Sequence, residues 1–111
     1  MDSKQENELP KTITAREVLD DANRVRQDRG RVYGHPYIQM DRAARIASAT
    51  LGIPITPDQV ALFYACGKLS RIAETAGARN RDSYVDACAY IALALELATT
   101  DPLDFYDDDQ S

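Results

Sequence analysis

Apolar residues recur every three or four positions along most of the chain, which is the spacing of one face of an α-helix. The first such run predicts a helix from Thr14 to about Gln27. Thr14 and Glu17 have the spacing of a capping box, in which two side chains satisfy the free backbone groups at a helix start. Residues 28–34 (DRGRVYG) then interrupt the period with two glycines and are predicted to form a loop.

Two further helices are predicted in the middle of the chain. The second helix begins at Pro36 and ends at Gly52, which suits a left-handed C-terminal cap. Its apolar stripe consists of Met40, Ala43, Ala44, Ala47 and Leu51. The third helix follows a second capping box at Thr56 and Gln59 and ends near Gly77. Its inward face is predicted to hold Val60, Phe63, Cys66, Leu69, Ser70 and Ala73.

The fourth predicted helix starts around residues 80–83 and ends near Thr99. Its stretch 87–95 (ACAYIALAL) is apolar on every side. A helix of this kind lies at the centre of a bundle or at a subunit interface. Because no strand pattern competes, the predicted fold class is all-α, with about four helices in a compact bundle that forms a homo-oligomer.

The charge of the chain is unevenly distributed. Of the net charge of -5, the segment from Thr14 to Thr100 contributes +1, whereas residues 101–111 hold five acidic residues and no basic one. We therefore expect three parts: a flexible arm over residues 1–13, a four-helix domain over 14–100 and an acidic tail over 101–111. The near-neutral domain can accept a small acidic ligand, whereas nucleic acid is not an expected partner.

The chain has no apolar run that approaches the length of a membrane span and opens with no secretory signal. Cys66 and Cys88 both lie in apolar helical segments, which is typical of reduced, buried thiols. The expected location is the cytoplasm, with no membrane partner.

Residues 24–36 are the first candidate for chemistry, because they hold four arginines and the single histidine of the chain next to a helix start. Guanidinium groups and free backbone N–H groups at a helix N-terminus are the components of a phosphate site. We predict Arg29, Tyr33 and His35 as ligand-binding residues. The alternative is a solvated helix end followed by a purely structural turn.

A second candidate lies between the third and fourth helices. An antiparallel pairing places Lys68 near Asp86 and Arg71 near Asp82. These contacts would be two ion pairs that fix the register of the hairpin, or one end of the cluster would face a pocket. In the second case Asp82 and Asp86 would hold Mg²⁺, or Lys68, Arg71 and Arg81 would bind phosphates.

Four motifs occur in the order seen in a family of small bacteriophage and prophage proteins, which the chain resembles over about residues 14–98. They lie at residues 28–36 (DRG…YGHP), 56–61 (TPDQVA), 68–71 (KLSR) and 81–90 (RDSYVDACAY). More distantly, the chain is similar to MazG-like all-α nucleoside triphosphate pyrophosphatases, which hold Mg²⁺ with an E-x-x-E and an E-x-x-D motif and act as dimers or tetramers. Asp86 would correspond to the last acid of the second motif, and the E-x-x-E motif is absent.

These observations predict a phage accessory protein that binds a phosphorylated, nucleotide-like small molecule in the infected bacterium. As an enzyme, it would be a MazG-like, Mg²⁺-dependent nucleotide pyrophosphohydrolase. The alternative is a non-enzymatic protein that sequesters a nucleotide signal, or that binds a host protein through its fourth helix or its acidic tail.

Overall fold

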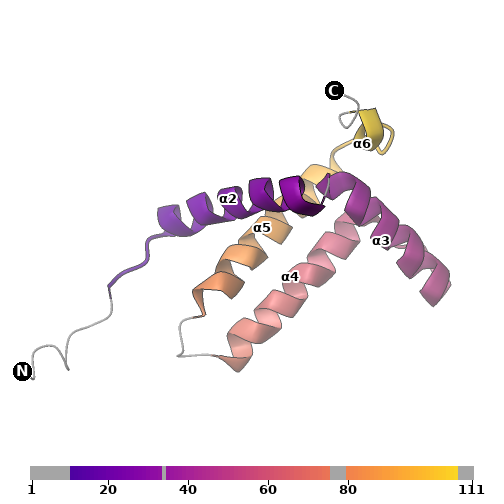
Figure 1. Cartoon of the computed structure of the whole chain (residues 1–111). Coiled ribbons are helices and arrows are strands. Elements are labelled where there is room, and N and C mark those ends of the chain that lie inside the picture. Colours follow the sequence, from indigo (N-terminus) through magenta and orange to yellow (C-terminus); the bar gives the residue numbers. More distant parts are fainter. Residues whose placement is uncertain (1–10, 34, 76–79, 108–111) are drawn as a thin grey trace, which may run out of the picture.

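The computed structural model describes residues 11–33, 35–75 and 80–107, which form an all-α fold without β-strands (Figure 1). The predicted fold class is therefore confirmed. Four long helices are followed by one short helix: α2 (Ala15–Tyr33), α3 (Pro36–Leu51), α4 (Pro57–Glu74), α5 (Arg81–Ala98) and α6 (Asp104–Asp107).

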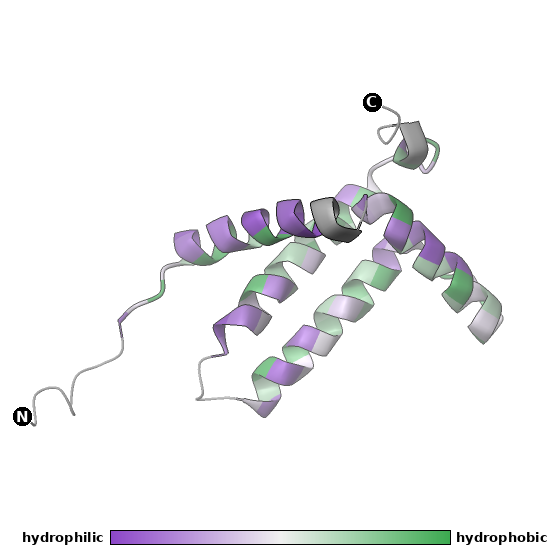
Figure 2. Cartoon of the chain, viewed as in Figure 1, coloured by the Kyte–Doolittle hydropathy of each residue, from purple (hydrophilic) through white to green (hydrophobic). Residues whose placement is uncertain are grey.

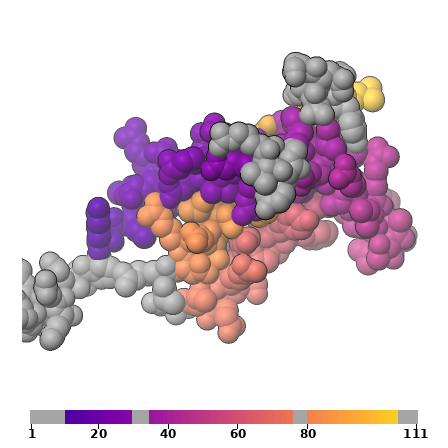
Figure 3. Space-filling model, in the orientation of Figure 1, coloured from indigo at the N-terminus to yellow at the C-terminus, as the bar shows by residue number. Residues whose placement is uncertain are grey.

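Helix α5 is central, because it packs against α4 as an antiparallel hairpin and against α2 on another face. Helix α3 packs against α4 and diverges from the hairpin, so that it stands out to one side of the molecule (Figures 1 and 3). None of the helices in the described ranges is long and apolar enough to cross a lipid bilayer.

Two clusters of buried side chains hold the helices together. The larger joins α3, α4, α5 and α6 and consists of Tyr37, Met40, Ala44, Val60, Ala61, Leu93, Ala94, Leu97 and Phe105. The smaller joins α2 to α5 through Ala22, Val85 and Ala89. Phe105 is only 1% exposed, and its ring centroid lies 5.2 Å from that of Tyr37. The first part of the acidic tail is therefore anchored in the core.

The predicted helix ends at Thr14, Gly52 and Thr56 are confirmed. The amide of Glu17 donates to Thr14 Oγ1 at 3.1 Å, and the amide of Thr14 donates to Glu17 Oε1 at 3.3 Å. The Thr56 amide donates to Gln59 Oε1 at 3.0 Å in the second capping box. Gly52 has a φ of 73°, and its amide donates to the carbonyl of Ser48, which closes α3.

The predicted loop over residues 28–34 is wrong, because α2 continues without interruption to Tyr33. Arginine is a good helix former and a single glycine is tolerated inside a helix, so the loss of apolar periodicity did not mark the end of the helix. Asp28 and Arg29 are exposed, and a helix end on the surface needs no apolar stripe. This correction moves Arg29 from a loop onto the last turns of α2.

The predicted inward face of α4 is mostly wrong. Val60 is buried, but the other buried residues are Ala61 and Ala65, whereas Phe63 and Leu69 are largely exposed. Cys66, Ser70 and Ala73 are exposed as well. Alanine allows α4 and α5 to approach closely, so the small residues of α4 face the partner helix and the large ones face outward. Figure 2 shows hydrophobic residues on several sides of both helices. In α3, Leu51 is also exposed, because it lies in the last turn beyond the contact with α4.

Candidate functional site

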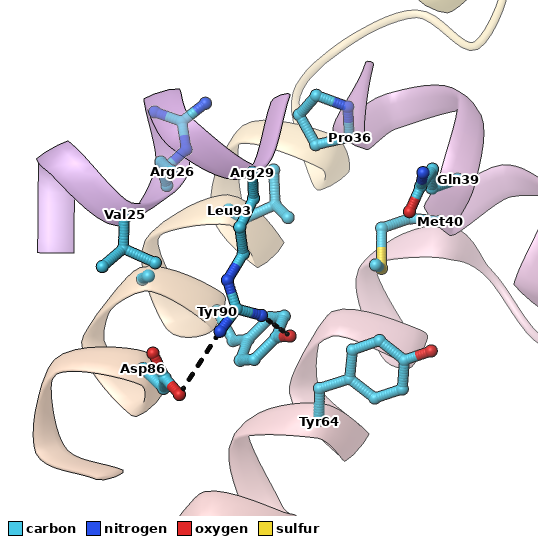
Figure 4. Close-up of a pocket in the computed structure, with 11 residues that line it drawn as sticks. Val25, Arg26, Arg29, Pro36, Gln39, Met40, Tyr64, Asp86, Tyr90 and Leu93 are labelled. Carbon is cyan, nitrogen blue, oxygen red and sulfur yellow. Dashed lines mark hydrogen bonds and ion pairs between the residues drawn. The ribbon is translucent and has the colours of Figure 1, made fainter. Parts of the chain in front are cut away.

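A small cavity lies where α2, α3, α4 and α5 meet, and we call it the central pocket (Figure 4). Its volume is about 150 Å³. Its walls are Val25, Arg26 and Arg29 from α2; Pro36, Gln39 and Met40 from α3; Tyr64 from α4; and Asp86, Ala89, Tyr90 and Leu93 from α5. The pocket therefore combines an apolar and aromatic interior with a few charged groups, which is the usual composition of a small-molecule site.

Arg29 reaches from α2 across the pocket to α5 (Figure 4). Its Nη1 donates to the hydroxyl of Tyr90 at 3.1 Å, and its Nη2 lies 3.6 Å from Asp86 Oδ2. Asp86 and Tyr90 are four residues apart on α5, so they lie on the same side of that helix. The guanidinium group has five N–H donors, and these two contacts leave several of them for a ligand.

Asp86 is shared by two cations. Lys68 Nζ, on α4, lies 3.1 Å from Asp86 Oδ2, and Arg29 approaches the same oxygen from α2. The side chains of Asp86 and Lys68 are only 14% and 20% exposed, whereas that of Arg29 is 48% exposed. Among the ion pairs of the described residues, one carboxylate faces two cations, so these contacts leave a positive charge whose accessible part is the guanidinium of Arg29.

Two tyrosines form an aromatic wall of the pocket. The rings of Tyr64 and Tyr90 meet edge to face, with their centroids 5.2 Å apart. Together with Met40 and Leu93 they provide a surface against which a flat ring can pack.

A second hollow of about 260 Å³ lies next to the central pocket and shares Tyr64 and Tyr90 with it. It is also lined by Phe63, Gly67, Lys68 and Arg71. The hairpin thus places two more basic side chains beyond the aromatic wall. We call this hollow the basic hollow.

Arg26 connects the central pocket to a third hollow, which is lined in part by His35 and Glu96. Arg26 Nη2 lies 3.2 Å from Glu96 Oε1, while its Nε is buried and has no hydrogen-bond partner among the described residues. The hydroxyl of Tyr37 donates to the other oxygen of Glu96. Burial raises the pKa of Tyr37 above its ordinary value, and the hydrogen bond to Glu96 raises it further.

The predicted pair Lys68–Asp86 is formed, and Arg29 joins it. His35 lies at the N-terminal cap of α3, where its Nδ1 accepts a hydrogen bond from the amide of Tyr37 at 3.2 Å. Its imidazole therefore has a structural partner beside the third hollow. Tyr33 is the last residue of α2, and its side chain lies outside the described residues.

The remaining predicted site residues lie elsewhere. Arg81 contacts Asp21 and Glu17, so it links the start of α5 to α2 away from the pocket. The hydrogen bond from Arg81 lowers the pKa of Asp21, and the positive charges of Arg81 and Arg24 contribute in the same direction. Arg71 and Asp82, both in described segments, form no ion pair with each other, and both are exposed.

The donor set fits a resident Mg²⁺ poorly. Asp86 is already held by Lys68 and Arg29, and Asp82 is exposed on α5. Within residues 11–33, 35–75 and 80–107, no group of three or more His, Cys, Asp or Glu side chains is arranged to hold a metal ion. A Mg²⁺ site would need further oxygen ligands, such as substrate phosphates.

Several pocket residues were not among the sequence-based candidates: Gln39, Met40, Tyr64 and Tyr90. Tyr90 lies inside the apolar stretch 87–95, where a tyrosine is typical of a core or interface residue. The signal that could have identified it is its spacing of four residues from Asp86, which places a hydroxyl beside a carboxylate on one helix face.

Residues 17–98 match a family described as a domain of unknown function (DUF6378). This match covers α3, α4, α5 and nearly all of α2, and therefore every residue of the central pocket. No curated protein and no solved structure matches the chain.

Proposed function

The chain belongs to the family described as a domain of unknown function (DUF6378), and we propose that it binds a small phosphorylated molecule of the nucleotide class in the central pocket. The observation that carries this proposal is the convergence of Arg29 and Lys68 on Asp86, because it sets two cations against one carboxylate beside an aromatic wall. Guanidinium groups bind phosphate oxygens through short, charge-assisted hydrogen bonds.

The volumes of the two neighbouring hollows suit a ligand with two unlike parts. The central pocket, at about 150 Å³, is smaller than the several hundred Å³ of a typical ligand site, so it holds the flat ring rather than the whole molecule. The ring packs against Tyr64 and Tyr90, which also form the wall of the basic hollow. The phosphates then extend past Arg29, which lines the central pocket, into that hollow toward Lys68 and Arg71.

The proposal is binding rather than hydrolysis. Asp86 is engaged by two cations and no cluster of further carboxylates lies within the described segments, so we propose no step that depends on a bound metal. The resemblance to MazG-like pyrophosphatases supports nucleotides as the ligand class. The role that agrees with it is that of a phage-encoded protein that sequesters a nucleotide in the cytoplasm. Hydrolysis stays a prediction of the sequence.

Isothermal titration calorimetry with a panel of nucleotides and the matching nucleosides tests the proposal. We expect Arg29→Gln to weaken nucleotide binding about 10-fold or more, because a charged hydrogen bond of about 1.5–3 kcal/mol is lost. Nucleosides lack the phosphate, so their affinity for the variant should be close to their affinity for the wild type. Pyrophosphate release in the presence of Mg²⁺ is measured in parallel and is expected to stay at background.

The matched control is Arg42→Gln, which removes the same charge from an exposed position on α3 that lines none of the described hollows. Arg42→Gln should bind nucleotides as the wild type does. The proposal is wrong if no nucleotide binds the wild type, or if the two variants lose affinity equally.

A further inference from the structure

The hairpin of α4 and α5 exposes a row of apolar side chains on each helix. On α4 the row is Leu62, Cys66, Leu69 and Ala73; on α5 it is Tyr84, Cys88, Ile91 and Leu95. All are exposed except Cys88, which is half-buried because it packs against the cluster between α2 and α5. Both rows follow the spacing i, i+4, i+7, i+11, which is the spacing of residues that pack one helix against another in a coiled coil.

Both rows lie on the same side of the hairpin, away from the central pocket. At about 100° per residue, Leu62 and Leu69 lie about 140–160° around α4 from Tyr64, which lines the pocket. Around α5, Leu95 lies about 140° from Tyr90 in the same way. Helix α2 covers the pocket side of α5 and packs near Cys88, and no other helix among the described residues covers the opposite side. We call this side the outer face.

The chemistry of the outer face suits contact with an identical surface. Its two rows contain no charged side chain, and charge appears only at its ends, at Asp58 of α4 and Arg81 of α5. A two-fold axis brings the same patch of both subunits together, which requires a surface complementary to itself. Two antiparallel helices with heptad-spaced apolar rows meet this requirement, because two such hairpins form a four-helix arrangement.

The area of the outer face is sufficient for a dimer. Helices of 18 residues are about 27 Å long, and two of them side by side are about 20 Å wide. Two such faces together bury about 1,100 Å², which exceeds the ~1,000 Å² expected of a specific interface. Contiguous exposed apolar patches of several hundred Å² on a protein surface mark interaction sites.

We propose that the outer face is the interface of a homodimer, in which the α4–α5 hairpins of two chains pack against each other. This arrangement covers the large apolar residues that a single chain leaves in water, including Leu69, which is 50% exposed. The central pocket stays open, because it lies on the other side of the hairpin. The dimer therefore does not depend on the proposed ligand.

Analytical ultracentrifugation over a wide range of protein concentrations tests the interface. We expect the wild type to sediment as a dimer, and Leu69→Glu to raise the dissociation constant about 100-fold or more, because it buries an unpaired charge in an apolar interface. Circular dichroism should show unchanged helix content for the variant, since position 69 is exposed in the single chain. Nucleotide binding by this variant should match that of the wild type.

Leu51→Glu is the matched control, since Leu51 is 62% exposed but lies at the end of α3, away from the outer face. This variant should remain a dimer. A wild type that stays monomeric at high concentration overturns the proposal, as does a Leu51→Glu variant that dissociates while Leu69→Glu does not.

A measurement on the unaltered chain covers the case in which Leu69→Glu does not fold. Cys66 lies within the outer face and is exposed in the single chain. Its rate of alkylation should fall as the protein concentration rises through the range of dimer formation, because the second chain covers the thiol. A rate that is independent of concentration contradicts the proposed interface.

Discussion

Asp86 has cationic neighbours on two different helices, Arg29 on α2 and Lys68 on α4, and its role differs between a binding protein and a metal-dependent hydrolase. In a binding protein its carboxylate competes with the ligand phosphate for the same cations. In a hydrolase it would hold the metal. Neutralising this one residue therefore changes nucleotide affinity in opposite directions for the two functions.

We expect Asp86→Asn to tighten nucleotide binding about 3- to 10-fold, because Arg29 and Lys68 are released to contact phosphate. Isothermal titration calorimetry with and without Mg²⁺ measures the change. Asp82→Asn is the control, since it removes an exposed carboxylate from the same helix. Loss of Mg²⁺-dependent binding in Asp86→Asn alone would instead support the metal-binding role.

A contact between two side chains was predictable from the sequence only where the helices that carry both side chains were themselves predicted. Lys68–Asp86 followed from an antiparallel pairing of two clear helices. Arg29 could not be placed, because its segment has no apolar period and α2 continues through it as an exposed helix. Tyr64 and Tyr90 lie in apolar stretches, where a tyrosine that lines a pocket has the same sequence pattern as one in the core.

At the scale of the helices, Gly52 and Gly67 provide a matched pair of positions for one substitution. A Cβ at either position would meet no atom within 4 Å, so the effect of alanine depends on the backbone alone. Gly52→Ala should destabilise the protein by about 1–2 kcal/mol, because Gly52 has a φ of +73° at the end of α3. Gly67→Ala, inside α4, should stabilise it by about 0.5–1 kcal/mol.

Urea unfolding at one fixed protein concentration measures both free energies of unfolding. Changes of the same sign in the two variants would contradict the backbone conformations described for these glycines.

The helices themselves were predictable because their caps and apolar periods are local properties of the sequence. The buried face of α4 was not, because this helix has apolar residues on two sides. The contact with α5 determines which side of α4 is buried. Ala61 and Ala65 face α5, and the ion pair of Lys68 with Asp86 fixes the same orientation of α4. The rule that large apolar residues face inward therefore selected the wrong side, and three of the selected residues, Cys66, Leu69 and Ala73, lie in the interface of the proposed dimer.

For the whole molecule, the proposed dimer would make the free energy of unfolding a property of two chains rather than one. If folding is coupled to dimer formation, the midpoint of thermal unfolding, Tm, rises with protein concentration by mass action. With about 2 cal/mol/K of unfolding entropy per residue in a dimer of this length, each tenfold increase in concentration should raise Tm by about 3 °C. Calorimetric scans at several concentrations measure this slope, and Leu51→Glu should preserve it. Leu69→Glu should unfold at a Tm that does not depend on concentration, and a wild type that does the same would show that the single chain is the stable unit.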